Sequence, residues 1–370
     1  MSPAKMKKMR LVSALLLILA LTACEPLVTT FEDVEDASLY TAGSISAAPA
    51  TIDTITVMTW NIRFGAGRLH WFGDSPGDRV ILTADEVNHH LQGIAAKIES
   101  AQPDILLIQD IDVKSKRTAY IDQVRWLLEN TYFNYGAYAS AWKAQTIPSD
   151  GLGRMDMGNA VLSRWPIRSA ERIKLPLRGD QDALTKHFYL RRNYLKTQIA
   201  LPGVDDFYAL CIHASAFSTD DTKKRQIDMF KDELDNLSAK GIPFVAGGDF
   251  NLLPPGATVI DYCLIDKADD ESFHAANDDP RHKEGSYFGG EEDWLQGLFN
   301  SYSTAVPLQD YLADESHYFS HTTVWAAPYD RKLDYLFSKI PWIVGSDSTH
   351  HDAAPWSDHA PVSAKWEAPK

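Results

Sequence analysis

The sequence contains few cysteines, so a disulfide framework is not predicted. Only three occur among 370 residues. Cys211 lies in an apolar run and Cys263 in a later loop. Two cysteines in a large domain do not predict a bridge, even in a compartment that permits one. We therefore expect Cys211 and Cys263 to be two ordinary buried thiols.

The sequence also lacks internal repeats, and it has no second hydrophobic helix after an apolar run near its start. Repeat architectures and multi-span membrane folds are therefore not indicated. Residues 53–370 are long enough for one large domain with a substantial core. We expect this domain to be a monomer.

Basic residues are scarce relative to acidic ones. The chain has 36 Lys and Arg against 50 Asp and Glu, which gives a formal net charge of −14 at pH 7. Loss of residues 1–23 would leave 32 basic residues and a charge of −18. Such a surface repels polyanions at long range, so extended nucleic acid is disfavoured as a partner. A local basic patch around a small phosphate remains compatible with this charge.

The N-terminus has the features of a secretory signal. Four basic residues between positions 5 and 10 precede the apolar run Leu11 to Leu21, which is too short to span a bilayer as a mature helix. Leu21-Thr22-Ala23-Cys24 resembles the lipobox of bacterial lipoproteins, which implies cleavage before Cys24 and lipidation of its sulfur. An ordinary signal peptide with an incidental cysteine is the alternative. Glu25 favours sorting to the outer membrane, with the domain facing the periplasm or the exterior.

Residues 24–52 lack sustained hydrophobic periodicity and contain several acidic residues. We interpret them as the lipidated cysteine followed by a flexible acidic tether. The membrane is thus expected as a partner through the lipid.

Hydrophobic periodicity predicts more strands than helices in the remaining chain. The turn at Pro202-Gly203 is expected to join two antiparallel strands. Helices fall between groups of strands, which indicates two sheets packed face to face with helices outside. The predicted strands are 55–60, 105–108, 160–162, 194–199, 207–212, 242–246, 333–337 and 361–366, and the predicted helices are 87–100, 119–130 and 227–237.

The stretch Gly247-Gly248-Asp249-Phe250-Asn251 follows one of these apolar strands. Asp249 and Asn251 are two residues apart, so they leave the same face if the strand geometry persists. A carboxylate beside an amide suits a hard cation or a reacting phosphate. A simple turn explains the pentapeptide equally well when it is taken alone.

Similar polar residues follow other predicted strands, which strengthens the functional interpretation. Each has a structural explanation by itself, but catalytic groups characteristically gather on loops at one edge of a rigid scaffold. The residues at these positions are Asn61, Asp110, His213, Asp249, Asn251, Asp358 and His359.

These positions fall in five of seven short motifs, and the order of the seven along the chain resembles that of the endonuclease/exonuclease/phosphatase superfamily. The resemblance covers about residues 54–367 and implies a four-layer α/β sandwich with two central, mostly antiparallel sheets flanked by helices. The motifs are Thr59-Trp60-Asn61-Ile62, Pro103 to Asp110, Gly158 to Arg164, Ile212-His213-Ala214-Ser215, Gly248 to Asn251, Arg331 to Phe337 and Ser357-Asp358-His359.

The resemblance implies a divalent metal site. Asn61 and Asp110 would hold the cation, and Asp358 would complete or assist its shell. Carboxylates, an amide oxygen and waters are typical ligands of Mg²⁺, and Mn²⁺ is an alternative. The family carries Glu where this chain has Asp110, which is one methylene shorter. We interpret this as a tuned site, and Asp110→Glu is expected to tighten metal binding.

The resemblance also implies catalytic roles. Asp249 would orient or deprotonate the attacking water, and Asn251 would position the phosphate or the nucleophile. His213 and His359 would donate hydrogen bonds to phosphoryl oxygens. Asp334 would hold the His359 tautomer. Whether His359 or Asp249 is the general base remains open.

Asn159, in the third motif, would lie near the substrate phosphate. Substrate choice is expected to depend on the inserts at about 66–83, 135–158 and 266–330. Arg191-Arg192 is a candidate for phosphate contacts, and Trp71 with Phe72 for the rim of the site.

Three functions are compatible with the sequence. The first is a lipid-anchored, Mg²⁺-dependent phosphodiesterase or phosphatase acting on a small or lipid-borne phosphate outside the cytoplasm. The second is a nuclease acting on DNA or RNA, which the acidic charge disfavours. The third is a surface-binding lipoprotein without turnover, which the presence of His213, Asp249, Asp358 and His359 argues against.

Overall fold

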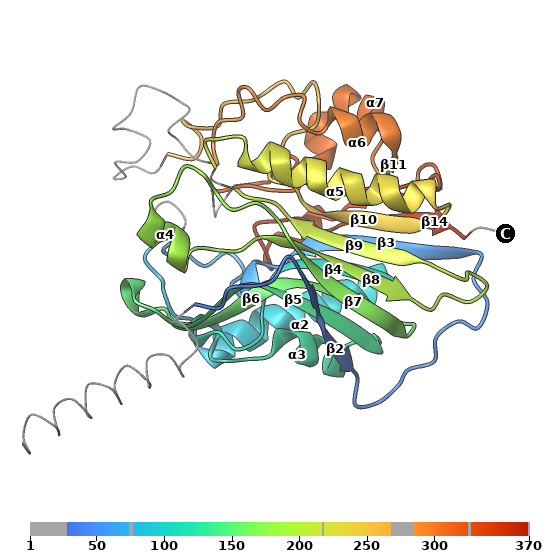
Figure 1. The fold of residues 1–370 in the computed structure, drawn as a ribbon, viewed down its shortest axis with the longest axis horizontal. Helices are drawn as coiled ribbons and strands as arrows, with labels where there is room; N and C mark the ends of the chain where they lie inside the picture. Colours follow the sequence, from blue (N-terminus) through green and yellow to red (C-terminus); the bar gives the residue numbers. More distant parts are fainter. Residues whose placement is uncertain (1–27, 74–76, 217, 268–284, 325–326, 369–370) are drawn as a thin grey trace, which may run out of the picture.

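The protein is a sandwich of two seven-stranded β-sheets with helices on both outer sides (Figure 1). This arrangement confirms the predicted four-layer α/β fold. The computed structural model describes residues 28–73, 77–216, 218–267, 285–324 and 327–368. The predicted signal peptide and Cys24 lie outside these residues. No helix in the described ranges has the length and apolar character needed to cross a bilayer.

The first sheet has the strand order β13-β14-β3-β4-β6-β5-β2. Of its neighbouring pairs, β3 and β4 are parallel and the others are antiparallel. Its strands are β2 (Ser38–Thr41), β3 (Thr54–Asn61), β4 (Ile105–Asp112), β5 (Tyr135–Ile147), β6 (Gly153–Ser163), β13 (Ser348–Thr349) and β14 (Val362–Glu367).

The second sheet has the order β1-β7-β8-β9-β10-β12-β11, and its one parallel pair is β9 with β10. The predicted hairpin across Pro202-Gly203 is β8 paired with β9. The strands are β1 (Val34–Asp36), β7 (Ile167–Lys174), β8 (Asn193–Ile199), β9 (Tyr208–His213), β10 (Phe244–Asp249), β11 (Ser303–Thr304) and β12 (Asp334–Ser338).

A continuous apolar core joins the inner faces of the two sheets. Val57 and Leu107 of the first sheet pack in the same cluster as Val245 and Leu336 of the second. Strands such as Ile105 to Ile108 are apolar at every position because both of their faces are covered. The parallel pairs therefore lie in the dry centre of the molecule.

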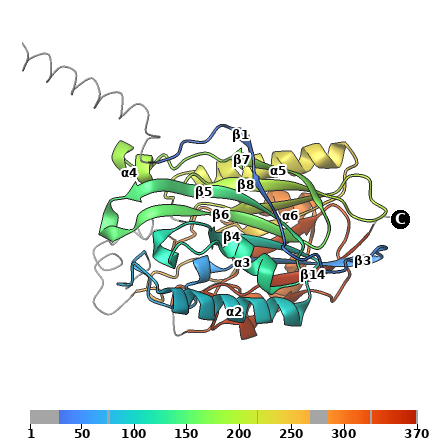
Figure 2. The same ribbon diagram turned by 90° about the horizontal axis from the view of Figure 1, so that it is seen from below.

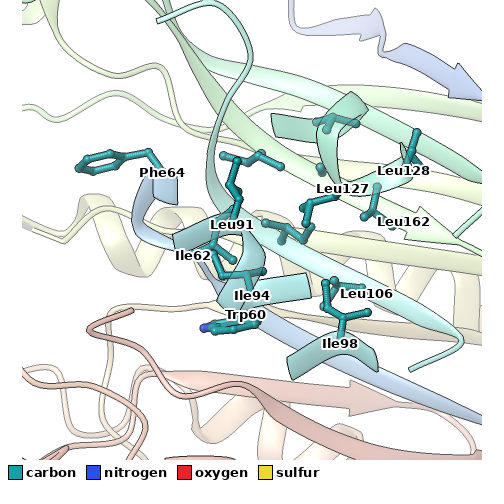
Figure 3. Close-up of a cluster of buried hydrophobic side chains, with 14 of the residues drawn as sticks. Trp60, Ile62, Phe64, Leu91, Ile94, Ile98, Leu106, Leu127, Leu128 and Leu162 are labelled. Atoms are coloured by element: carbon teal, nitrogen blue, oxygen red, sulfur yellow. The ribbon is translucent and has the colours of Figure 1, made fainter. Parts of the chain in front are cut away.

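Helices α2 (Ala84–Ala101) and α3 (Gln123–Asn130) cover the outer face of the first sheet (Figure 2). Leu91, Ile94 and Ile98 recur at helical spacing and face Trp60 and Leu106 (Figure 3). Helix α2 begins at a capping box, in which the Thr83 side chain and Glu86 satisfy each other's backbone N–H groups.

Helices α5 (Thr222–Ala239), α6 (Gln296–Ser301) and α7 (Leu308–Ala313) lie on the other side of the sandwich (Figure 1). Phe230 and Leu234 of α5 pack on Leu210 of β9 and Phe244 of β10. A short helix, α4 (Ala183–Phe188), lies between β7 and β8 in the chain.

The prediction of a flexible tether over 24–52 is wrong for the segment from Val34 to Thr41. Residues 34–41 form β1 and β2, which pair with β7 and β5, and Val28 is fully buried. Both strands lie at sheet edges and most of their side chains are exposed. Backbone hydrogen bonds hold them, so they need no apolar periodicity in the sequence.

The insert expected at 135–158 is also structured. It forms β5 and most of β6, so the strand predicted at 160–162 is far longer than expected. Two register shifts interrupt the β5–β6 ladder, and they also interrupt the alternation of side chains between the two faces of the sheet.

The third difference from the predicted elements is small: the helix predicted at 119–130 begins at Gln123. Both predicted thiols are confirmed, because Cys211 and Cys263 are buried and are not joined by a disulfide.

A buried ion pair supports the loop that follows β3. Arg117 donates two hydrogen bonds to the Asp112 carboxylate, at 2.9 and 3.0 Å, and both side chains are almost fully buried. The same guanidinium lies over the Phe64 ring at 3.5 Å. The pair therefore links the end of β4 to the residues next to Asn61.

We predict that Arg117→Met destabilises the protein by about 3–5 kcal/mol, because Asp112 would stay buried without its counter-charge. Urea unfolding of the purified protein measures this change. The double variant Arg117→Met/Asp112→Leu removes both charges and should recover a large part of the loss. A double variant as unstable as Arg117→Met would contradict this explanation.

Candidate active site

The predicted catalytic residues meet at one edge of the sandwich. Asn61, His213 and Asp249 are the last residues of β3, β9 and β10, and these strands come from both sheets. Asp334 is the first residue of β12 and pairs with Asp249 across the antiparallel ladder. Strand direction and register therefore bring together side chains that are far apart in sequence.

These side chains surround an open cleft of about 840 Å³, including space that is open to solvent. Of the predicted site residues, seven line it: Asn61, Asp110, His213, Asp249, Asn251, Asp358 and His359. Asp334 lies behind His359 and contacts it from outside the cleft.

Asp249 is the centre of the site. Its side chain is almost completely buried and accepts a hydrogen bond from Asn61 Nδ2 at 3.0 Å. Nε2 of His213 lies 3.2 Å from the same oxygen, and Nε2 of His359 lies at 3.6 Å. The second oxygen accepts from the Asn251 backbone N–H at 3.0 Å. Donors on several sides thus hold this carboxylate in one position.

His359 is oriented by Asp334. Nδ1 of His359 lies 2.8 Å from Asp334 Oδ2, which also accepts from the Ser320 hydroxyl at 2.7 Å. Burial lowers the pKa of His359, but the carboxylates of Asp334 and Asp249 outweigh it and raise the pKa to about 10. The two carboxylates thus favour the protonated ring, with Nδ1 facing Asp334 and Nε2 facing Asp249.

Asp110 differs from the other site residues in its backbone. Its φ is +50°, and it lies where the ladder between β4 and β6 shifts register. Asp110 Oδ1 is 3.0 Å from Nδ1 of His213, without the alignment of a hydrogen bond, and 3.9 Å from Nη1 of Arg192. Burial raises the pKa of Asp110, but the charges of His213 and Arg192 outweigh it and hold the pKa below its usual range. Asp110 is thus an ionised carboxylate.

Arg63 links two of the predicted metal ligands. Its backbone N–H donates to Asn61 Oδ1 at 3.0 Å, and its Nε lies 3.1 Å from Asp358 Oδ2. The ligand atoms of Asp358, His359 and His321 lie within 4.8 Å of one another. The His321 ring also packs against the His359 ring at a tilt of 37°, with ring centroids 4.3 Å apart. The sequence motifs do not include His321.

The donor set around the cleft fits a divalent cation. Asn61, Asp110 and Asp358 offer amide and carboxylate oxygens, which are the donors a hard cation prefers. A second close group, Asp249, Asp334 and His359, is already explained by the hydrogen bond between Asp334 and His359. The assignment of each individual ligand stays a prediction.

Asn159 occupies a different position from the other predicted residues. It is buried in β6, and its side-chain amide donates to the Asn193 carbonyl at 3.0 Å. It is not among the residues that line the cleft. This position favours a role in joining β6 to β8 over contact with substrate.

The cleft contains further residues that the motifs did not identify. The sequence could have indicated Arg63, because it lies two residues after Asn61, and the same spacing separates Asn251 from Asp249. His321, Trp142 and Tyr189 gave no sequence signal, since each lies in a segment without a motif. Their presence depends on how the inserts fold over the strand ends.

The chain matches the model of the endonuclease/exonuclease/phosphatase family over residues 58–359, and it belongs to this family. Enzymes of this family are divalent-metal-dependent phosphoester hydrolases, and this chain is an enzyme of that class. A search of curated protein sequences finds no significant match.

Two solved structures show the same fold. One is an endonuclease/exonuclease/phosphatase from Beutenbergia cavernae DSM 12333, with 19% identity, 85% of this chain and 72% of that chain covered, and a TM-score of 0.56. The other is an endonuclease/exonuclease/phosphatase family protein from Leptotrichia buccalis C-1013-b, with 14% identity, 85% and 100% covered, and a TM-score of 0.51.

We predict that Asp110→Glu binds Mg²⁺ and Mn²⁺ more tightly than the unmodified protein, because the longer side chain reaches further into the cleft. Isothermal titration calorimetry measures the affinity. Asp150→Glu, an exposed substitution of the same kind, is the control and should change nothing. Weaker or unchanged metal binding by Asp110→Glu would show that the shorter side chain is not what limits affinity.

Proposed function

We propose that the protein is a Mg²⁺-dependent hydrolase that cleaves a phosphoester bond of a small or lipid-borne phosphate. The observation that carries this proposal is the position of Asp249, which contacts Asn61, His213 and His359 at the wall of an open cleft. The attack of water on phosphorus requires acid, base and hydrogen-bond donor groups of this kind.

In this mechanism Asp249 accepts a proton from the attacking water. The choice of Asp249 over His359 as the base follows from charge, because an imidazolium has no lone pair left to accept a proton. The bond from water oxygen to phosphorus forms as the bond to the leaving oxygen breaks. His359 donates its Nε2–H to a phosphoryl oxygen on which charge increases.

Other residues position these groups. Asp334 fixes the ring of His359, and Asn61 fixes the carboxylate of Asp249. Arg192 adds a positive charge to the wall of the cleft near Asp110. A bound divalent cation, held by Asn61, Asp110 and Asp358, would neutralise phosphate charge and polarise the phosphoryl oxygen.

A single activity screen tests this proposal. Residues 25–370 are assayed with Mg²⁺ or Mn²⁺ on bis-p-nitrophenyl phosphate, p-nitrophenyl phosphate, plasmid DNA and phospholipid. We expect metal-dependent turnover of at least one ester and a loss of at least about 100-fold in Asp249→Ala and in His359→Ala.

The exposed substitutions Asp205→Ala and His317→Ala serve as matched controls and should retain full activity. Turnover of plasmid DNA alone would favour the nuclease function instead. An absence of metal-dependent turnover on every substrate would overturn the proposed hydrolase activity.

We further propose that Cys24 is lipidated and that the enzyme acts outside the cytoplasm. The support is Leu21-Thr22-Ala23-Cys24 after a basic and an apolar segment. Labelled palmitate should be incorporated into the protein in a bacterial host and recovered with the membrane fraction. Cys24→Ala should abolish both. Equal labelling of Cys24→Ala would show that Cys24 is not the lipid site.

A further inference from the structure

One wall of the cleft is aromatic. Trp71, Trp142 and Tyr189 are partly exposed and line the same cleft as the catalytic residues. We call these three residues the aromatic wall. Met157 and Leu190 add apolar surface to this cleft. None of the seven catalytic motifs contains a residue of the aromatic wall, so it is a candidate for substrate specificity.

The aromatic wall is held in place by its surroundings. The Trp142 indole N–H donates to the Phe188 carbonyl at 2.7 Å. Trp71 packs edge-on against Phe64 at 5.1 Å, and Trp71 and Trp142 pack on the same small apolar cluster. The Tyr189 hydroxyl accepts from Arg178 at 3.4 Å. A binding surface fixed in this way loses little conformational entropy when a ligand is bound.

The segment that carries Tyr189 also carries a cation for phosphate. Arg192 lines the cleft three residues later, and its side chain is 8% exposed. Its Nε and Nη1 have no hydrogen-bond partner among the described residues. Its charge lies 3.9 Å from Asp110, next to His213. Arg192, His359 and the aromatic wall therefore line the same cleft as Asp249.

The chemistry of the aromatic wall selects between ligand classes. The Trp142 N–H is engaged and the Trp71 N–H is buried, so the Tyr189 hydroxyl, which accepts from Arg178, has only its own O–H to offer the hydroxyls of a sugar. A long acyl chain would have to share the cleft with charged groups. A ligand with a planar ring needs only the faces and edges of the aromatic side chains. Stacking of a ring on these side chains is favourable, and every nucleobase can make it.

We propose that the substrate is a small phosphoester that carries a planar aromatic group, such as a nucleobase, and that Trp71, Trp142 and Tyr189 bind this group. The inference rests on the proposed phosphoester hydrolase activity and names its substrate class. Net acidity disfavours a long polyanion, so the ligand is of nucleotide size.

A matched pair of ligands tests this proposal. Adenosine 5′-monophosphate and ribose 5-phosphate share the phosphate and the sugar and differ in the adenine. Calorimetric titration of the purified full-length protein with Mn²⁺ gives both dissociation constants. We expect the adenine compound to bind about tenfold more tightly, within the range of one base–aromatic stack.

Substitutions test the contributions of the aromatic wall and of Arg192 separately. Trp142→Leu keeps apolar bulk but removes the indole, and should bring the ratio of the two dissociation constants close to one while ribose 5-phosphate binding is retained. Arg192→Met should weaken both ligands by the same factor. Trp126→Leu, a partly exposed tryptophan on α3, is the control and should leave the ratio unchanged.

The outcomes distinguish this inference from the proposed function. Equal affinity for the two ligands, binding of neither, or an adenine preference that survives Trp142→Leu overturns the aromatic wall as a binding site. Hydrolysis of bis-p-nitrophenyl phosphate is measured on the same samples. If hydrolysis proceeds without an adenine preference, only the inference fails. A preference that depends on Trp142, without metal-dependent turnover of any tested ester, leaves the aromatic wall as a binding site and removes the proposed function.

Discussion

The site depends on one buried carboxylate. Asp249 is almost fully enclosed, and such a group is costly to bury unless donors surround it. Those donors come from Asn61, His213 and the Asn251 backbone, with His359 close by. Because they belong to strands of both sheets, the two sheets must pack in one register for this carboxylate to be satisfied. The same requirement assembles the active site.

The polar contacts beneath the site extend this dependence into the core. Gln109 donates to Cys211 Sγ across the two sheets at 3.1 Å, and Cys211 lies 3.3 Å from the Ile108 carbonyl. Burial raises the pKa of the Cys211 thiol to about 12, so it is an uncharged, unreactive thiol that fills space. Residues that flank Asp110 and His213 in the sequence therefore fix the spacing of the sheets that carry them.

The sequence predicted those parts of the fold and site that depend on local pattern. Strands buried on both faces, such as Ile105 to Ile108, are apolar throughout, and polar residues directly after them marked the site edge. The edge strands β1 and β2 could not be predicted, because most of their side chains are exposed and their sequences lack an alternation of apolar and polar residues. The pairing of His213 with Asp110 and the approach of His321 to His359 depend on tertiary packing between distant segments.

The segment from Val34 to Thr41 has a mechanical consequence. Its first half is a strand of one sheet and its second half is a strand of the other, with a single residue between them. A segment connected in this way links the edges of the two sheets along that side of the sandwich. The sheets cannot slide or separate there without breaking at least one of the two edge ladders. This short segment thus adds a covalent link between the two sheets to the packing of their apolar inner faces.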